Sequence, residues 1–336
     1  MLQQTTIAAV MPYYERFREQ FPTVADLADA EESQVLRLWE GLGYYSRARN
    51  LHRAAKVIVE QLDGQFPQTV DDLQQLPGIG PYTARAIASV ALGQPVGILE
   101  ANTLRLYSRL IELEVDPRST AGNRLLWEFA DWIVAPRSAS AFNQAAMDLG
   151  STICTPDAPA CDRCPVRANC CSARSNRQHE LPIAAAKKQM TDVTEVAFVI
   201  RRGGKVLLKQ YETGERWAGL WDFVRFSVSI EAGDQLLGLP RPSEAAHATL
   251  FEDEASQLAI TLAMEQTGLQ IGAPGLLKQI RHTVTRYRVR LLCLQSARVQ
   301  GAVDRSRGLK WMPLEKLEEL PLSTTARKIA DMTARK

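Results

Sequence analysis

Residues 76–90 read LPGIGPYTARAIASV, and Gly78 and Gly80 in this stretch separate two helix-like segments. Glycine permits a turn with positive φ and lets an anion come close to backbone N–H groups. The helix that follows adds its positive end, and Pro81 suits a first helical turn. The stretch therefore predicts a turn between two helices that can bind a phosphate without reading a sequence. By itself, a glycine turn is a weak indication of this function.

The bulk composition is that of a globular protein with a sizeable core, since 46% of the 336 residues are apolar and 23% are charged. A chain of this length predicts about two domains. The sequence contains no run of about 18 apolar residues, so no membrane span is predicted. The first residues also lack the basic, then apolar, then small-residue order of a signal peptide. We expect a soluble intracellular protein with no membrane partner.

The charge differs between the two halves of the chain. Residues 1–175 hold 16 Lys+Arg and 20 Asp+Glu, a net charge of −4, whereas residues 176–336 hold 24 and 18, a net charge of +6. Totals of this size do not identify a nucleic-acid binder, because local patches decide such binding.

The first half of the chain has helical periodicity throughout, with no alternating strand pattern before about residue 190. Thr23 with Asp26, and Thr69 with Asp72, have the spacing of capping boxes at helix starts. Helices are predicted at 11–21, 32–41, 46–62, 82–92, 100–113, 121–134 and 139–150.

The second half begins after a polar stretch, residues 176–192, that we interpret as a linker. Two apolar runs around Gly203-Gly204 predict a β-hairpin. Strands are predicted at 221–230 and 281–294, and a helix that ends at Gly268 lies between them. The fold class is therefore an all-α domain followed by an α+β domain.

Five of the six cysteines lie between residues 154 and 171. CTPDAPACDRCPVRANC spaces four of them as Cys154-x6-Cys161-x2-Cys164-x5-Cys170, while Cys171 is left over and Cys293 fits a core position. Four thiolates suit zinc or an iron–sulfur cluster, but structural zinc usually needs two short Cys pairs and only one is present. The spacing resembles the [4Fe–4S] loop of the endonuclease III superfamily of DNA glycosylases, so we favour a [4Fe–4S] cofactor.

The glycine turn and the cysteine spacing together resemble the helix-hairpin-helix motif and cluster loop of that superfamily. Its lyase members carry a lysine nucleophile two residues after the second glycine, and Tyr82 occupies that position here. A tyrosine cannot form a Schiff base, so the residue disfavours a lyase. Tyr82 is either a packing aromatic or a wall of a base pocket.

Three further stretches resemble the A/G-specific adenine DNA glycosylase family: MLQQT at 1–5, GLGYYSRARNLH at 41–52 and FNQAAMDLGSTIC at 142–154. The resemblance implies a helix-hairpin-helix glycosylase domain (1–150), a cluster loop (151–175), the linker (176–192) and a Nudix-like domain that recognises 8-oxoguanine (193–336). It also implies a monofunctional base-excision enzyme that removes adenine opposite 8-oxoguanine or guanine in double-stranded DNA. We expect a monomer in the bacterial cytoplasm, at the nucleoid.

The same resemblance implies roles in DNA binding for residues near the start of the chain. Gln4 and Thr5 would touch the 8-oxoguanine side, and Leu42 and Tyr44 would wedge into the base stack. Arg47, with Arg49 and Arg53 on the same helix, would lie near phosphates, or else form a solvated helix face.

The carboxylate that matches the family's catalytic aspartate is Glu100, in Glu100-Ala101-Asn102 where the family has Asp-Gly-Asn. The resemblance places Glu100, Asn102 and Tyr82 at the catalytic site. Glutamate reaches one methylene further, and a shift of about 1 Å can cost on the order of a hundredfold in rate. The alternative is that Glu100 is only an acid favoured by a helix N-terminus.

In the Nudix-like part, Trp221, Asp222 and Phe223 match the family's Gly-Leu-Trp-Glu-Phe-Pro stretch. A Nudix hydrolase is disfavoured, because LAITLAMEQTGL carries a single acid where the Mg²⁺ box is expected. The family reads 8-oxoguanine with His-x-Phe-Ser-His, and the corresponding residues here include Thr285 and Arg286, whose side chains can hydrogen-bond a guanine edge. The alternative is an ordinary strand with a basic face.

The family's general-acid glutamate stands two residues before the stretch that begins here at Met1. We expect one of two explanations: the true start codon lies upstream, or the chain lacks the acid. The first is favoured because loss of the leading helix would expose apolar faces of its neighbours to water. The rival to an active glycosylase is therefore a non-catalytic binder of the 8-oxoguanine·adenine lesion.

Overall fold

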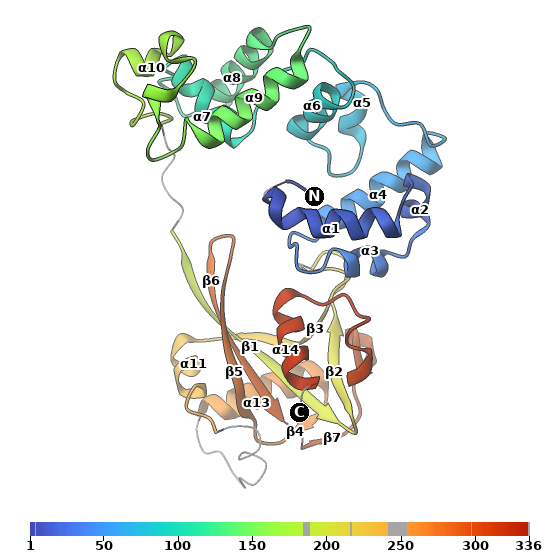
Figure 1. Ribbon diagram of the computed structural model, residues 1–336. Helices are drawn as coiled ribbons and strands as arrows, with labels where there is room; N and C mark the ends of the chain where they lie inside the picture. Colours follow the sequence, from blue (N-terminus) through green and yellow to red (C-terminus); the bar gives the residue numbers. More distant parts are fainter. Residues whose placement is uncertain (4, 184–188, 216, 241–253, 297, 335–336) are drawn as a thin grey trace. The chain divides into compact units, whose positions relative to one another are not determined.

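The computed structural model describes residues 1–3, 5–183, 189–215, 217–240, 254–296 and 298–334 (Figure 1). It contains two compact units, of which one comprises Met1–Lys56 together with Lys188–Lys336 and the other comprises Val57–Lys187. No helix among the described residues is long and apolar enough to cross a membrane.

Four helices open the chain: α1 (Ile7–Gln20), α2 (Val24–Asp29), α3 (Glu32–Leu38) and α4 (Ser46–Gln61). The predicted capping box is confirmed at α2, where the Asp26 N–H donates to Thr23 Oγ1 (3.1 Å) and the Thr23 N–H donates to the Asp26 carboxylate (2.9 Å). Phe17 packs edge-on against Trp39, which is almost completely buried. These contacts fix the helices that precede the loop at residues 39–45.

The described residues of the second unit form helices and loops but no strand, as predicted. It contains α5 (Val70–Gln75), α6 (Pro81–Val90), α7 (Ala101–Leu110), α8 (Thr120–Ile133), α9 (Ala139–Thr152), α10 (Cys171–Arg174) and the 3-10 turns Cys161–Arg163 and Arg167–Asn169. Thr69 caps α5, because its Oγ1 accepts the Asp72 N–H (3.1 Å). Helices α7, α8 and α9 share a core that includes Tyr107, Leu126 and Ala146.

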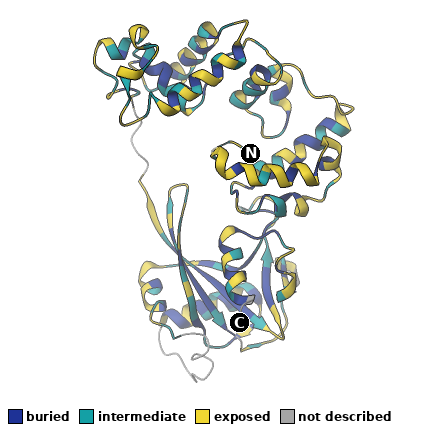
Figure 2. Cartoon of the chain, viewed as in Figure 1, coloured by how far each residue is buried: buried dark blue, intermediate teal, exposed yellow. Residues whose placement is uncertain are grey.

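The remaining chain forms a mixed six-stranded sheet in the order β5-β6-β1-β3-β2-β8. The strands of this part are β1 (Thr191–Arg202), β2 (Lys205–Gln210), β3 (Trp221–Val228), β4 (Gln270–Ile271), β5 (Gly275–Val284), β6 (Tyr287–Ser296), β7 (Val299–Gln300) and β8 (Leu309–Pro313), with 3-10 turns at Arg305–Arg307 and Leu314–Lys316. Strand β1 is parallel to β6 and antiparallel to β3. Central strands are buried on both faces (Figure 2).

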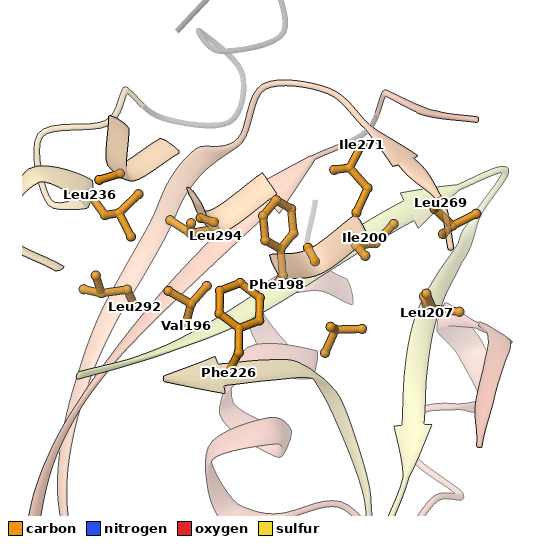
Figure 3. Packing of buried hydrophobic residues seen from close by; sticks show 14 of the residues in the cluster. Val196, Phe198, Ile200, Leu207, Phe226, Leu236, Leu269, Ile271, Leu292 and Leu294 are labelled. Atoms are coloured by element: carbon orange, nitrogen blue, oxygen red, sulfur yellow. The ribbon is translucent and has the colours of Figure 1, made fainter. Parts of the chain in front are cut away.

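Helices cover both faces of this sheet. On β1, Phe198 faces the cluster formed with α11 (Ile230–Leu236) and α13 (Glu254–Thr267), as Figure 3 shows for the strand side chains and Leu236. The neighbouring Val199 faces the opposite cluster, to which α14 (Thr324–Ala334) contributes Ile329. This alternation follows from the two-residue period of a strand and produces a three-layer arrangement.

The predicted hairpin at Gly203-Gly204 is confirmed, and both residues have positive φ (55° and 74°), as a two-residue turn between twisted strands requires. The prediction of one strand over residues 281–294 is wrong. The chain turns back at Thr285-Arg286, and Val284 pairs with Tyr287 across β5 and β6. This turn contains neither glycine nor asparagine, the residues that usually supply a left-handed backbone. Thr285 adopts that conformation instead (φ 55°).

The opening helices are fastened to the sheet-containing part of their unit by charged contacts. The Arg327 guanidinium donates to both carboxylate oxygens of Glu40 (2.5 and 3.0 Å). Only 7% of the Glu40 side chain is exposed, so the pair is shielded from water. Tyr45 Oη donates to the Leu322 carbonyl (3.3 Å) beside it.

We expect Thr285→Gly to raise the free energy of unfolding by about 1 kcal/mol, because a β-branched residue with positive φ is strained by 1–3 kcal/mol and glycine is not. Urea denaturation measures the change. Thr283→Gly, two residues earlier in β5, is the matched control and should lower stability instead. Equal destabilisation by both variants would contradict the strain.

Candidate functional site

The glycine turn has the geometry that its sequence predicts. Gly78 has φ 78°, and Gly80 is the extended residue that caps α6, with Pro81 at the first helical position. Both glycines are exposed. The first-turn N–H groups of a helix have no intrahelical partner, so this exposed end of α6 can bind an anion.

Glu100 is the N-cap of α7. One carboxylate oxygen, Oε1, accepts the N–H groups of Asn102 and Thr103, both at 2.8 Å, and the Glu100 N–H donates to Thr103 Oγ1 (2.8 Å). This is a capping box with a glutamate in place of serine or threonine. Within the described residues the second oxygen, Oε2, accepts no hydrogen bond. The structural role of a helix acid and a chemical role for Oε2 are therefore compatible.

Two tyrosines feel the charge of Glu100. Burial, and then the Glu100 carboxylate, raise the pKa of Tyr82 above its ordinary value. The same two causes raise the pKa of Tyr107 to about 12. Both phenols are therefore neutral at physiological pH. The predicted residues Tyr82, Glu100 and Asn102 thus lie in one neighbourhood, in which Glu100 supplies a negative charge.

Asn102 is linked to the cysteine segment through Arg105, a residue that the sequence analysis missed. Arg105 Nη2 donates to Asn102 Oδ1 (3.0 Å), and Arg105 Nε donates to the carbonyl of Cys154 (2.8 Å). Arg105 lies one turn after Asn102 on α7, so the helical spacing could have indicated the first contact but not the second.

The four predicted cysteines line one cavity, together with Leu106, Arg109 and Gln178 among others: Cys154, Cys161, Cys164 and Cys170. None of them forms a disulfide. Among the described residues, no three His, Cys, Asp or Glu side chains are close enough to hold a single metal ion. The structure therefore brings the four predicted cysteines to the wall of one cavity.

Arg109 is buried beneath this cavity, with 2% of its surface exposed. Its guanidinium donates to the carbonyls of Leu181 (2.9 Å), Thr155 (2.7 Å) and Pro156 (3.0 Å). Arg109 Nη1 also lies 3.3 Å from the sulfur of Cys154. Arg109 is therefore a buried cation in direct contact with one of the four predicted cysteines.

The surroundings of two of these cysteines disfavour the negatively charged thiolate. Burial, and then the neighbouring Cys154 and Cys164, raise the pKa of Cys161. Burial is also the largest cause that raises the pKa of Cys170. Ionisation of Cys161 and Cys170 is therefore disfavoured by their surroundings, and a bound cation would offset that cost.

In the other unit, Tyr44 is 58% exposed and has positive φ (48°), whereas Leu42, the second predicted wedge, is buried. Thr5 is partly buried and accepts a hydrogen bond from Arg47 (3.1 Å). Gln4 lies outside the described residues. Tyr44 is therefore the most exposed of the described residues in this set.

The three arginines of α4 have different environments. Arg47 donates to main-chain carbonyls on two segments, and Arg49 Nη1 donates to the Ala218 carbonyl (2.7 Å). Arg53 is exposed and contacts Asn50. Of the three, Arg53 best fits the expected solvated face.

At the β5–β6 turn, Thr285 and Arg286 are both exposed. Arg286 Nη2 donates to Tyr287 Oη (3.0 Å), and its guanidinium lies 5.2 Å from the centre of the Tyr287 ring. The strained residue predicted to contact the lesion is therefore at the tip of a hairpin, where strain often marks a functional site.

Comparisons with known proteins agree with these features. Residues 1–131 match the HhH-GPD superfamily of base excision DNA repair proteins, and residues 196–332 match the NUDIX domain. The chain thus combines a domain of the HhH-GPD superfamily with a NUDIX domain, which confirms the predicted fold class.

Relatives of known name narrow this class. The chain is 44% identical over 198 residues to the adenine DNA glycosylase of Homo sapiens, covering 59% of this chain and 36% of that protein. It is 32% identical over 231 residues to that of Buchnera aphidicola subsp. Schizaphis graminum, covering 69% and 67%. The chain belongs to the adenine DNA glycosylase family, although it spans about a third of the length of its mammalian relatives.

Among solved structures, a thermostable thymine-DNA glycosylase is similar with a TM-score of 0.48 and 26% identity, over 52% of this chain and 80% of that one.

Proposed function

We propose that the protein is an adenine DNA glycosylase of base-excision repair, which removes adenine mispaired with 8-oxoguanine or guanine in duplex DNA. The observation that carries this proposal is Glu100, the N-cap of α7 in a member of this family, whose Oε2 accepts no hydrogen bond from the part of the chain that the structure describes. An adenine inside a duplex is out of reach, so the base is first flipped into the enzyme.

The role of Glu100 follows from the charge that develops during cleavage. As the glycosidic bond breaks, the sugar gains oxocarbenium character, and a nearby carboxylate stabilises that positive charge. Hydrogen bonds from two N–H groups hold Glu100 Oε1 in place, so the charge is already oriented before the reaction. The departing adenine also needs a proton from an acid, and we assign no residue of this chain to that step.

DNA binding is proposed for the glycine turn and for the lesion-facing residues. Gly78 and Gly80 would let a phosphate approach the first turn of α6. Thr5, with Gln4 beside it in sequence, and Tyr44, in the loop before α4, would contact the lesion, while Thr285 and Arg286 would contact 8-oxoguanine from the hairpin tip. Support comes from the exposure of Tyr44 and of the hairpin tip.

We also propose that Cys154, Cys161, Cys164 and Cys170 hold a [4Fe–4S] cluster. Their shared cavity and the cation beside Cys154 support this assignment. Such a cluster supplies one-electron chemistry and a rigid centre for an irregular loop. The proposed reaction uses neither property directly.

A second function, binding of the lesion without cleavage, is favoured by one observation. Glu100 replaces the family's aspartate and already spends one oxygen on capping α7. If the carboxylate only caps the helix, the chain would bind the mispair and release no adenine.

We expect Glu100→Gln to slow adenine release by about a hundredfold or more, because the amide keeps a cap acceptor but loses the charge. Single-turnover release from a duplex with adenine opposite 8-oxoguanine measures the rate. Glu100→Asp, which restores the family's residue, should remain active, and the exposed Glu128→Gln should match the unmodified chain.

Tight lesion binding by the unmodified chain, with no adenine released by it or by Glu100→Asp, would favour the binder over the glycosylase. Trapping of a covalent complex by borohydride would instead indicate a lyase.

We expect Gly80→Ala to weaken duplex binding on the order of tenfold, because the added methyl group would keep a phosphate from approaching the backbone N–H groups. The size of the effect is that of one lost hydrogen bond to a charged group. A Cβ at Gly80 meets no atom within 4 Å and the residue is extended, so stability should change by less than about 1 kcal/mol. Gly64→Ala is the control: its φ of 76° predicts lower stability with unchanged DNA binding. Unchanged binding by Gly80→Ala would contradict the phosphate clamp.

We expect the chain purified without air to contain the iron of one [4Fe–4S] cluster, and Arg109→Met to retain it about 10- to 100-fold less well, as for other residues that orient metal ligands. Iron analysis and visible absorbance after challenge with a chelator measure retention. The exposed Arg163→Met is the matched control. An iron-free, colourless preparation of the unmodified chain would contradict the cluster.

A further inference from the structure

Arg47 lies in the first turn of α4 and joins two segments that are far apart in sequence. Its Nη1 donates to the carbonyls of Met1 (2.8 Å) and Gln3. Its Nη2 donates to Thr5 Oγ1 (3.1 Å), and to the carbonyls of Leu42 and Gly43 (both 3.3 Å). The two terminal nitrogens carry four hydrogens, so these five acceptors already occupy them.

The same guanidinium lies between two aromatic rings. It is 5.5 Å from the ring centre of Trp39 and 5.3 Å from that of Tyr44. Trp39 is buried and donates through Nε1 to the Gly43 carbonyl (3.0 Å), so it provides a fixed base for the stack. Each ring face attracts the cation, so the guanidinium and the Tyr44 ring hold one another in place.

Tyr44 needs this support. It is a bulky residue with positive φ, and more than half of its surface is exposed, so packing within its own loop cannot fix it. A backbone of this kind persists only where the surroundings determine it. The contacts of Arg47 with the Tyr44 ring and with the carbonyls of Leu42 and Gly43 are such surroundings.

We propose that Arg47 is a positioning residue for lesion recognition: it holds Thr5 and Tyr44 in one fixed arrangement and does not serve as a phosphate contact. This inference rests on the proposed function, in which these two residues face the lesion. Since its terminal nitrogens are occupied by the protein, Arg47 would affect the preference for one duplex over another through the residues that it holds. A phosphate contact would instead raise affinity for every duplex equally.

Salt dependence separates the two roles. The test measures the affinity of the unmodified chain, Arg47→Lys, Arg47→Met and Arg18→Met for a duplex with adenine opposite 8-oxoguanine and for an undamaged duplex, at several salt concentrations. Arg18 is an exposed arginine of α1 and controls for the loss of a charge. Removing a phosphate contact reduces the slope of log affinity against log salt by about 1.

For Arg47→Met we expect an unchanged slope and a preference for the lesion duplex that is about tenfold smaller, as for one disturbed base contact. Arg47→Lys should lie between, because lysine keeps the charge but lacks the planar fork. Arg18→Met should keep the preference. A slope lower by about 1 with the preference intact would overturn the inference, and so would no change in either quantity.

Hydrogen exchange provides a readout that needs no DNA. Amides of residues 42–46 should exchange faster in Arg47→Lys and Arg47→Met than in the unmodified chain or in Arg18→Met. Equal exchange in all four proteins would overturn the positioning role. If the unmodified chain shows no preference for the lesion duplex but exchange rises in the Arg47 variants, the proposed function fails while the role of Arg47 in this loop stands.

Discussion

The cysteine-bearing segment depends on the buried cation of Arg109. A guanidinium that is 2% exposed would destabilise the protein by several kcal/mol if it lacked partners. Its partners are carbonyls at Cys154, Thr155, Pro156 and Leu181, in parts of the chain with no helix or strand to satisfy them. Each group therefore needs the other, and one side chain of α7 holds the chain both at the first of the four cysteines and beyond the fourth.

Arginine is used in the same way at two other places. Arg105 connects Asn102 to the Cys154 carbonyl, and Arg47 connects residues 1–5 to the loop before α4. A planar fork with five N–H donors can bind several carbonyls of an irregular loop at once, which lysine cannot. The regular helices thus carry side chains that shape the irregular segments on which Thr5, Tyr44 and Cys154 lie.

The local parts of the fold could be predicted from sequence, because their signals lie within a few residues. Thr23 and Thr69 mark helix starts, and Gly203-Gly204 marks a hairpin, since each acts on its own turn. The four cysteines that the sequence spacing singled out line one cavity, whereas their assignment to a cluster depended on the family resemblance. The buried position of Leu42 and the carbonyl partners of Arg47 and Arg109 could not be predicted, since these contacts join residues more than 40 positions apart or depend on tertiary packing. The turn at Thr285 was missed because threonine rarely takes positive φ.

The ion pair between Glu40 and Arg327 joins the beginning of the chain to its end. A stop codon at or before position 327 would remove the guanidinium and leave the shielded carboxylate of Glu40 without its bidentate partner. A truncating allele that spares every candidate catalytic and cluster residue would therefore still disturb the helices that lead into the Tyr44 loop. The loss would therefore reach the helices next to Tyr44 from a residue that lies 287 positions after Glu40 in sequence.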